Sequence, residues 1–214
     1  MSETYKLEKI RLSCERDVRE ALDYIGVDTE DFNLKNSMFT RPKHSAIHGI
    51  GHIYRVMIGC ALLGRLEQKP REALLAFCGA YIHDLAREND SIDFEHGANA
   101  VLKHFERFNH IWDKYRLTPQ EREQVKEAVI QHSTREYFKP GDSGYDVMAM
   151  LKDADALDRC RIGDLAPDML RYAASRELIK VIEYICFKTL RVNDDIDLDE
   201  FLKMWSVDVD GANS

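Results

Sequence analysis

Residues 71–88 read REALLAFCGAYIHDLARE and decide the fold class. Apolar side chains recur in this stretch at intervals of three and four residues, which is the spacing that places them on one face of an α-helix. Strands instead alternate apolar and polar residues with a period of two. The stretch therefore predicts a helix over 71–88 whose buried face carries Leu74, Phe77, Cys78, Tyr81, Ile82 and Leu85.

The same periodicity extends over most of the chain. It predicts further helices over 8–25, 52–67, 96–110, 145–159, 168–190 and 198–205. Thr118-Pro119-Gln120-Glu121 has the form of a capping box with proline at the first helical position, so we expect a helix that begins there and reaches His132. Strand-like alternation is absent. These patterns predict an all-α fold.

Proline and glycine fall between the predicted helices, as at Pro42, Pro70, Pro140 and Gly163. No stretch between helices is long or biased enough to be a linker, and no internal repeat is visible. We therefore expect one domain over 1–214, a single helical bundle.

Composition limits the partners and the compartment. The chain has 214 residues, 44% of them hydrophobic, and a net charge of −8, which is typical of a globular protein and disfavours long nucleic acid as a ligand. No apolar stretch reaches the roughly 20 residues needed to span a membrane, and the amino terminus lacks a signal-peptide pattern. The five cysteines form no CxxC motif, and we expect reduced, inert thiols. A cytoplasmic protein is predicted.

Histidines and aspartates mark the candidate site. A buried carboxylate or imidazole without a partner is costly, and such groups on separate helices can satisfy one another by sharing a cation. This donor set suits Mn, Fe, Zn, Ni or Mg rather than soft, thiolate-bound metals. Asp155 falls in helical register with Met148 and Leu151, which turns it inward. The residues concerned are His48, His52, His83, Asp84, His96, His132, Asp153, Asp155 and Asp158.

The order of these residues resembles a known family. His52 precedes Arg55-Val56, His83-Asp84 follows 31 residues after His52, and Asp155 lies 71 residues after Asp84. This H…HD…D pattern is similar to that of the HD-domain superfamily of metal-dependent phosphohydrolases, over residues 44–165. The resemblance implies a helical metal-binding core, with His52, His83, Asp84 and Asp155 as ligands of a divalent metal ion. Asp153 and Asp158 would be supporting or surface groups.

A second set of residues suggests a second metal ion. The run from His83 to Asp90, followed by Glu95-His96-Gly97, resembles a small-protein branch of the superfamily, and His132 falls where two-metal members carry a further histidine. His96 and His132 would then hold a second ion, bridged by Asp84. Contacts of these two histidines with substrate phosphate, or helix capping, are the alternatives. Motifs that define the cyclic-dinucleotide and (p)ppGpp branches are absent, so neither specificity is implied.

The implied activity is hydrolysis of a small phosphate ester, such as a nucleotide, by metal-activated water. The metal would be Mn, Mg, Fe, Co, Ni or Zn. Arg55 and Arg87, each one helical turn from a predicted ligand, are expected to contact phosphate, with Arg161 and Arg159 as further candidates. His48 is expected to orient substrate or donate a proton.

Two other functions fit the same residues. One is a di-iron oxygenase, since distant relatives with mixed histidine and carboxylate sites cleave inositol and phosphonates. The other is a non-catalytic module that senses a nucleotide. Nothing in the sequence sets the oligomeric state, although the predicted helices over 8–25 and 168–190 carry apolar faces that suit either the core or a homodimer contact.

Overall fold

The computed structural model of the protein describes residues 16–40, 45 and 47–205. These residues form an all-α bundle, as predicted, and contain no strand. An isolated antiparallel bridge joins Leu34, which precedes α2 (Ile50–Leu66), to Ile196, which precedes α9 (Leu198–Lys203). Of the predicted helix over 8–25, residues 16–25 are helical, and the remainder lies outside the described residues.

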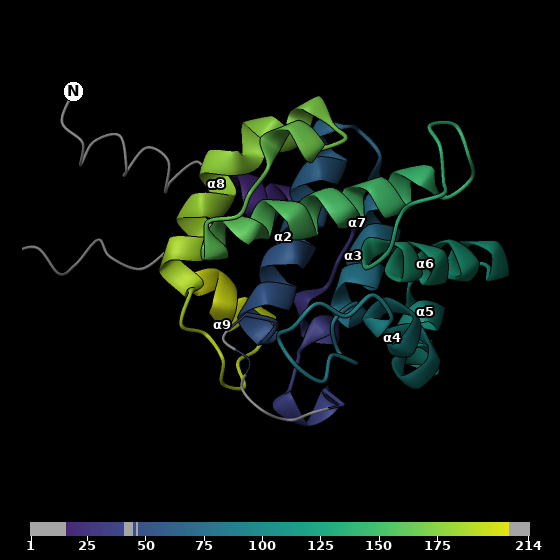
Figure 1. The fold of residues 1–214 in the computed structure, drawn as a ribbon, viewed down its shortest axis with the longest axis horizontal. Coiled ribbons are helices and arrows are strands. Elements are labelled where there is room, and N and C mark those ends of the chain that lie inside the picture. Colours follow the sequence, from purple (N-terminus) through teal and green to yellow (C-terminus); the bar gives the residue numbers. More distant parts are fainter. Residues whose placement is uncertain (1–15, 41–44, 46, 206–214) are drawn as a thin grey trace, which may run out of the picture.

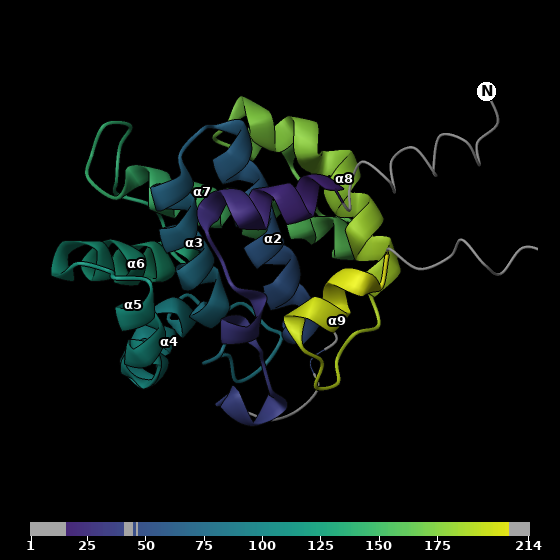
Figure 2. The same cartoon turned by 180° about the vertical axis from the view of Figure 1, so that it is seen from behind.

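Two antiparallel neighbours, α2 (Ile50–Leu66) and α3 (Pro70–Ile82), form the centre of the bundle. Figure 1 shows α7 (Tyr145–Asp158) crossing them on one side, and Figure 2 shows the helix over 16–25 on the opposite side. Gly59 permits the close crossing of α2 and α7, because a Cβ at this position would lie 2.9 Å from the Cβ of Ala154. This approach brings the start of α2 close to the end of α7.

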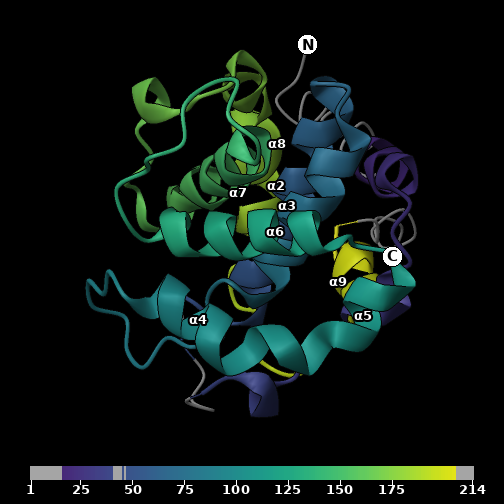
Figure 3. The same ribbon diagram turned by 90° about the vertical axis from the view of Figure 1, so that its right-hand side faces the viewer.

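The remaining helices surround this centre. In Figure 3, α4 (His96–His104), a 3-10 turn (Phe105–Phe108) and α5 (Asn109–Lys114) run as one row beside α6 (Pro119–His132). The capping box at the start of α6 is present as predicted. Helix α8 (Ala173–Thr189) packs on α2 and α7, and α9 (Leu198–Lys203) lies near the end of the described chain.

The structure corrects three predicted helices, of which the one over 168–190 begins only at Ala173 because the backbone is extended at Leu170 and Tyr172. The helix predicted over 71–88 ends at Ile82, and the chain then turns, with the Leu85 amide donating to the Ile82 carbonyl and the Arg87 amide to that of Asp84. The apolar pattern continued to Leu85 because that side chain is buried although it is not helical. The predicted helix over 96–110 is interrupted at Phe105.

One hydrophobic core cluster unites these helices, α2 and α3 contribute more than half of their residues to it, and nearly every residue of α2 is buried. Such near-complete burial explains why α2 is apolar around most of its circumference. Among the described residues, no helix is both long enough and apolar enough to cross a membrane.

Candidate metal centre

Six predicted ligands meet at one end of the bundle. His52 lies in the first turns of α2, while His83 and Asp84 occupy the turn directly after α3. His96 begins α4, His132 ends α6, and Asp155 lies in the last turn of α7. Helix ends rather than helix middles supply most of the site, and His83 and Asp84 reach it because α3 stops at Ile82.

Hydrogen bonds fix the tautomers of the first two histidines. The Nδ1–H of His52 donates to the carboxylate of Asp158 over 2.7 Å, and the Nδ1–H of His83 donates to the Ala80 carbonyl over 2.7 Å. In its neutral form, each ring then carries its lone pair on Nε2. This arrangement, with an acceptor behind the ring, is typical of histidines that bind metal ions.

The second pair of histidines is anchored in the same way. The Nδ1–H of His132 donates to the Val129 carbonyl at 2.5 Å, and the Nδ1–H of His96 donates to the Asp93 carbonyl. Gly97 allows the close contact between α4 and α6 that sets these rings beside each other, because a Cβ at this position would lie 2.2 Å from the Val129 oxygen.

The free nitrogens of the four rings converge in two pairs. Nε2 of His52 lies 3.2 Å from Nε2 of His83, and Nε2 of His96 lies 2.8 Å from Nε2 of His132. Since every Nδ1 is engaged as a donor, two lone pairs can face each other at these distances only around a positive charge. A shared proton or a metal ion would supply that charge.

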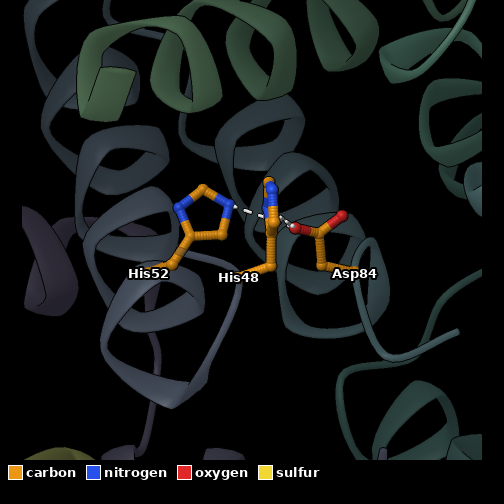
Figure 4. A group of neighbouring side chains, drawn as sticks. All are labelled: His48, His52 and Asp84. Atoms are coloured by element: carbon orange, nitrogen blue, oxygen red, sulfur yellow. Dashed lines mark hydrogen bonds and ion pairs between the residues drawn. The ribbon is translucent and has the colours of Figure 1, made fainter. Parts of the chain in front are cut away.

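Asp84 lies between the two pairs. Its Oδ1 is 3.2 Å from Nε2 of His96 and 3.7 Å from Nε2 of His132. Its Oδ2 is 3.3 Å from Nε2 of His52 and accepts from Nδ1 of His48 at 2.9 Å. Figure 4 shows both of these last two rings directed at the Asp84 carboxylate. One carboxylate oxygen is therefore available to each histidine pair.

The spacing of the donor atoms fits a metal ion. Ligands held at about 2.0–2.2 Å from a cation are separated from one another by roughly 3.0–3.5 Å at common coordination angles. Around Nε2 of His52, the neighbouring donors of His83, Asp84 and Asp155 lie at 3.2, 3.3 and 3.4 Å. Buried His and Asp clusters in this region could hold an ion. The donors present thus fit a divalent cation.

The pKa values indicate how protons distribute over the cluster. Burial lowers the pKa of His83 to about 3, so this imidazole is neutral. Burial and Arg161 act to lower the pKa of His52, but its hydrogen bonds with Asp158 and Asp84 raise it above the ordinary value. For Asp84, burial alone would raise the pKa, yet the surrounding histidines hold it well below its usual range. The centre therefore combines an ionised Asp84 carboxylate with a neutral His83, and these are the protonation states in which the two groups bind a metal ion.

Arg55 was predicted to contact phosphate, but its side chain is buried against Asp158. Its Nε lies 2.5 Å from Oδ1 of Asp158 and its Nη2 3.1 Å from Oδ2, and its Nη1 donates to the Thr189 hydroxyl at 3.2 Å. Both charged residues are almost fully buried, and Arg55 does not line the pocket described below. The phosphate contact predicted for Arg55 is therefore corrected to an ion pair that holds Asp158 behind His52. Asp158, predicted only as a supporting or surface group, is this buried support.

Asp153 and Asp155, both on α7, have different surroundings. Asp155 faces the site with 31% of its side chain exposed, so it is less buried than its register predicted. Asp153 is fully buried but points elsewhere, where it accepts from Arg171 Nη1 at 2.9 Å and from the Ser175 hydroxyl at 2.6 Å. Asp153 is a structural residue remote from the cluster.

A pocket of about 220 Å³ opens over the cluster, and His48, Asp84, His96, His132 and Asp155 line it. The predicted ligands His52 and His83 lie behind this surface, 2% and 0% exposed. Donor atoms that face the pocket are therefore backed by buried ones, as expected for an ion held at the floor of a cleft.

Three arginines also line the pocket, with different partners. Arg161 pairs with Asp158 at 3.2 Å, and Arg159 pairs with Asp164. Arg87 Nη1 lies beside the His96 ring, 3.0 Å from Nδ1 and 3.3 Å from Nε2, and Nη2 donates to the Ser91 carbonyl. Within the described part of the chain, Arg87 has no ion pair, and its buried Nε has no hydrogen-bond acceptor.

Sequence reasoning missed the apolar rim of the pocket. Ile92 and Phe94 line it and are 85% and 68% exposed. They lie in the loop between α3 and α4, where no periodicity exists to assign their direction. Two large exposed apolar residues within three positions, directly before Glu95-His96, were the available signal.

Comparisons of the chain with models of protein families, with curated proteins and with solved structures find no match.

Proposed function

We propose that this protein is a metal-dependent phosphohydrolase of the HD-domain type that acts on a small phosphate ester, with nucleotides as the first class to test. The observation that carries the proposal is the position of Arg87. The partly buried Arg87 guanidinium, whose buried Nε has no acceptor and which has no carboxylate partner among the described residues, lines the same pocket as the metal-ligand cluster. A pocket that offers a cation site and an unpaired arginine side by side favours an anion with several oxygens.

The proposed ligands are His52, His83, Asp84 and Asp155 for one divalent cation, with His96 and His132 for a second that shares Asp84. A bound divalent cation supplies a Lewis acid that polarises a phosphoryl oxygen and makes water a stronger nucleophile at neutral pH. Mn, Mg, Fe, Co, Ni and Zn are all compatible with these donors.

Arg87 would bind the phosphoryl oxygens. Its Nε–H has no hydrogen-bond acceptor among the described residues, and phosphate is a strong acceptor for a guanidinium. Arg159 and Arg161 add positive charge to the same pocket, although each already has a carboxylate partner. Arg87 is therefore the proposed catalytic arginine, and the other two lower the cost of bringing an anion to the site.

His48 would move a proton. Its Nδ1 is 2.9 Å from Oδ2 of Asp84, and burial lowers its pKa, so the neutral ring donates Nδ1–H to the carboxylate. Nε2 is then the atom that can accept a proton. The Asp84 carboxylate would stabilise the imidazolium that forms, and His48 could return the proton to the leaving group.

Ile92 and Phe94 suggest what the rest of the substrate is. They offer exposed apolar surface at the rim, where a nucleobase or another flat apolar group could pack. The pocket volume of about 220 Å³ suits one small molecule rather than a polymer. A nucleoside phosphate meets both conditions.

The test is phosphate release from a panel of nucleotides, nucleoside monophosphates and sugar phosphates, with each metal supplied separately. Asp84→Asn and Arg87→Gln should each reduce turnover at least about 100-fold, the loss typical of removing one charge-stabilising group. His104→Gln is the matched control, because His104 is equally buried but bonds Thr40 and Arg107 instead of the cluster. Release that is independent of metal, or unchanged in Asp84→Asn, would refute the proposal.

A di-iron oxygenase is the second candidate, favoured by the arrangement of Asp84 with one oxygen toward each histidine pair. Oxygen uptake by the iron-loaded protein without phosphate release would support it. A nucleotide sensor would instead bind nucleotide with no turnover under any metal.

A further inference from the structure

Two cysteines from different elements meet directly behind the metal centre. Cys160 lies in the 3-10 helix Arg159–Ile162, and Cys186 lies in α8. Their sulfur atoms and a carboxylate oxygen of Asp158 all lie within 4.8 Å of one another. Cys186 is buried and Cys160 is partly exposed, so the pair has one side open to solvent. The sequence predicted inert, reduced thiols because the cysteines form no CxxC motif.

The surroundings favour thiol chemistry over metal binding at this pair. Asp158 is already bound by Arg55, His52 and Arg161, and two guanidinium groups would repel a cation. The same positive charges stabilise a thiolate. A hydrogen bond from Cys160 lowers the pKa of Cys186 despite its burial, and the Arg55 charge contributes in the same direction.

We propose that Cys160 and Cys186 form a reversible disulfide when a hydroperoxide oxidises them, and that this bond weakens metal binding by displacing Asp158 from His52. The sulfur atoms must close a gap of at most about 3 Å to reach the bond length of about 2.05 Å. The 3-10 helix and α8 already pack on each other, so a side-chain rotation with a small shift of the 3-10 helix would suffice.

The oxidation balances with hydrogen peroxide as the oxidant. The Cys186 thiolate attacks one peroxide oxygen, so an S–O bond forms while the O–O bond breaks, and the departing hydroxide takes up a proton to leave as water. The Cys160 sulfur then attacks the sulfenic sulfur, so the S–S bond forms while the S–O bond breaks. The second water carries away the Cys160 proton. The two thiols together lose two electrons, which reduce the peroxide to two waters.

The effect on the metal centre follows from the position of Asp158. Asp158 begins the turn into the 3-10 helix that contains Cys160, and its carboxylate accepts the Nδ1–H of His52. Pulling Cys160 toward α8 moves this carboxylate relative to His52. Disturbing the acceptor behind a ligating histidine typically costs about 10–100-fold in metal affinity. This second half of the proposal rests on the proposed metal centre, whereas the bond itself does not.

Separate measurements test the disulfide and its effect on metal binding. Full-length protein carrying Cys14→Ser, which removes the cysteine outside the described residues, is treated with hydrogen peroxide and digested with trypsin. The expected product is peptide 181–188 joined to the dipeptide Cys160-Arg161, reversible by dithiothreitol. Absence of this species, or its formation only after denaturation, would overturn the proposed bond.

Calorimetric titration with Mn²⁺ then compares reduced and oxidised protein. The proposal predicts at least about 10-fold weaker binding after oxidation and full recovery on reduction. Cys160→Ser, treated identically, should keep the affinity of the reduced protein. A disulfide that leaves Mn²⁺ affinity unchanged would overturn the coupling. Reduced protein that binds no Mn²⁺ would refute the metal centre, while the peptide map still decides the bond.

Discussion

Replacing Asp158 by Asn tests whether the residues behind His52 position it for metal binding. The wild-type carboxylate accepts from Nδ1 of His52 at 2.7 Å and from Arg55 at 2.5 and 3.1 Å. Asn keeps the shape and one acceptor oxygen, but it removes the charge and presents an amide NH₂ to a donor. If the retained oxygen faces the Arg55 guanidinium, the amide NH₂ faces His52, which then loses the acceptor that fixes its Nε2 lone pair toward the cluster.

Two magnitudes follow from this change. Removing one member of a buried ion pair costs about 3–5 kcal/mol of unfolding free energy, and the acceptor that Asn retains places this variant near the lower end. The native protein should survive this loss, because total stabilities are typically about 5–15 kcal/mol. Loss of the group behind a ligating histidine should weaken metal binding about 10–100-fold.

The matched control is Asp153→Asn on the same helix. Asp153 is equally buried and also pairs with an arginine, Arg171, but it touches no histidine of the cluster. Chemical denaturation of both metal-free variants should show similar losses of stability, whereas calorimetric Mn²⁺ titration should show weaker binding only for Asp158→Asn. Wild-type affinity in Asp158→Asn, or an equal loss in Asp153→Asn, would refute the positioning role.

Three other outcomes are expected. Gly97→Ala should destabilise the protein by several kcal/mol, of the order of overpacking costs, and should displace His132. The reason is that the new Cβ would lie 2.2 Å from the Val129 carbonyl oxygen in α6. An unchanged thermal unfolding temperature would contradict this contact. Mn²⁺ at 100 times its dissociation constant should stabilise the protein by about 2.7 kcal/mol. Thermal unfolding with and without chelator measures this effect, which should be lost in His83→Ala. The Arg71 contact lowers the pKa of Glu121 to about 2 from 4.5, so its stabilisation is present above pH 4.5 and is lost as the pH falls toward 2. Glu121→Gln should therefore cost about 1 kcal/mol at pH 7, and denaturation curves of the two proteins should converge in acid; a constant difference would argue against the ion pair.

Much of the architecture could be predicted because helical periodicity is a local property. The boundaries of α6 and α7 follow from a capping box and an apolar pattern, both readable from adjacent residues. The end of α3 could not be read in this way. Leu85 is buried in a turn and continues the helical spacing by coincidence, so the pattern conceals the break that presents His83 and Asp84.

Long-range pairing explains the other differences. Arg55 had the right spacing from His52 to contact substrate, but its partner Asp158 comes from α7, far along the chain, and spacing on one helix cannot reveal it. The same limit hid the contact between Cys160 and Cys186. His52, His83, Asp84 and Asp155 could be nominated because their order along the chain resembles a family pattern, and the fold brings their donor atoms together.

Anomalous diffraction from a crystal of the protein grown with Mn²⁺ tests the central claim most directly. We expect an anomalous peak within about 2.0–2.3 Å of Nε2 of His52 and His83 and of an Asp84 oxygen. A second peak is expected beside His96 and His132. The His104→Gln protein should give the same peaks. A map with no peak at this cluster, from protein shown to be folded and supplied with saturating Mn²⁺, would contradict the assignment of a metal centre.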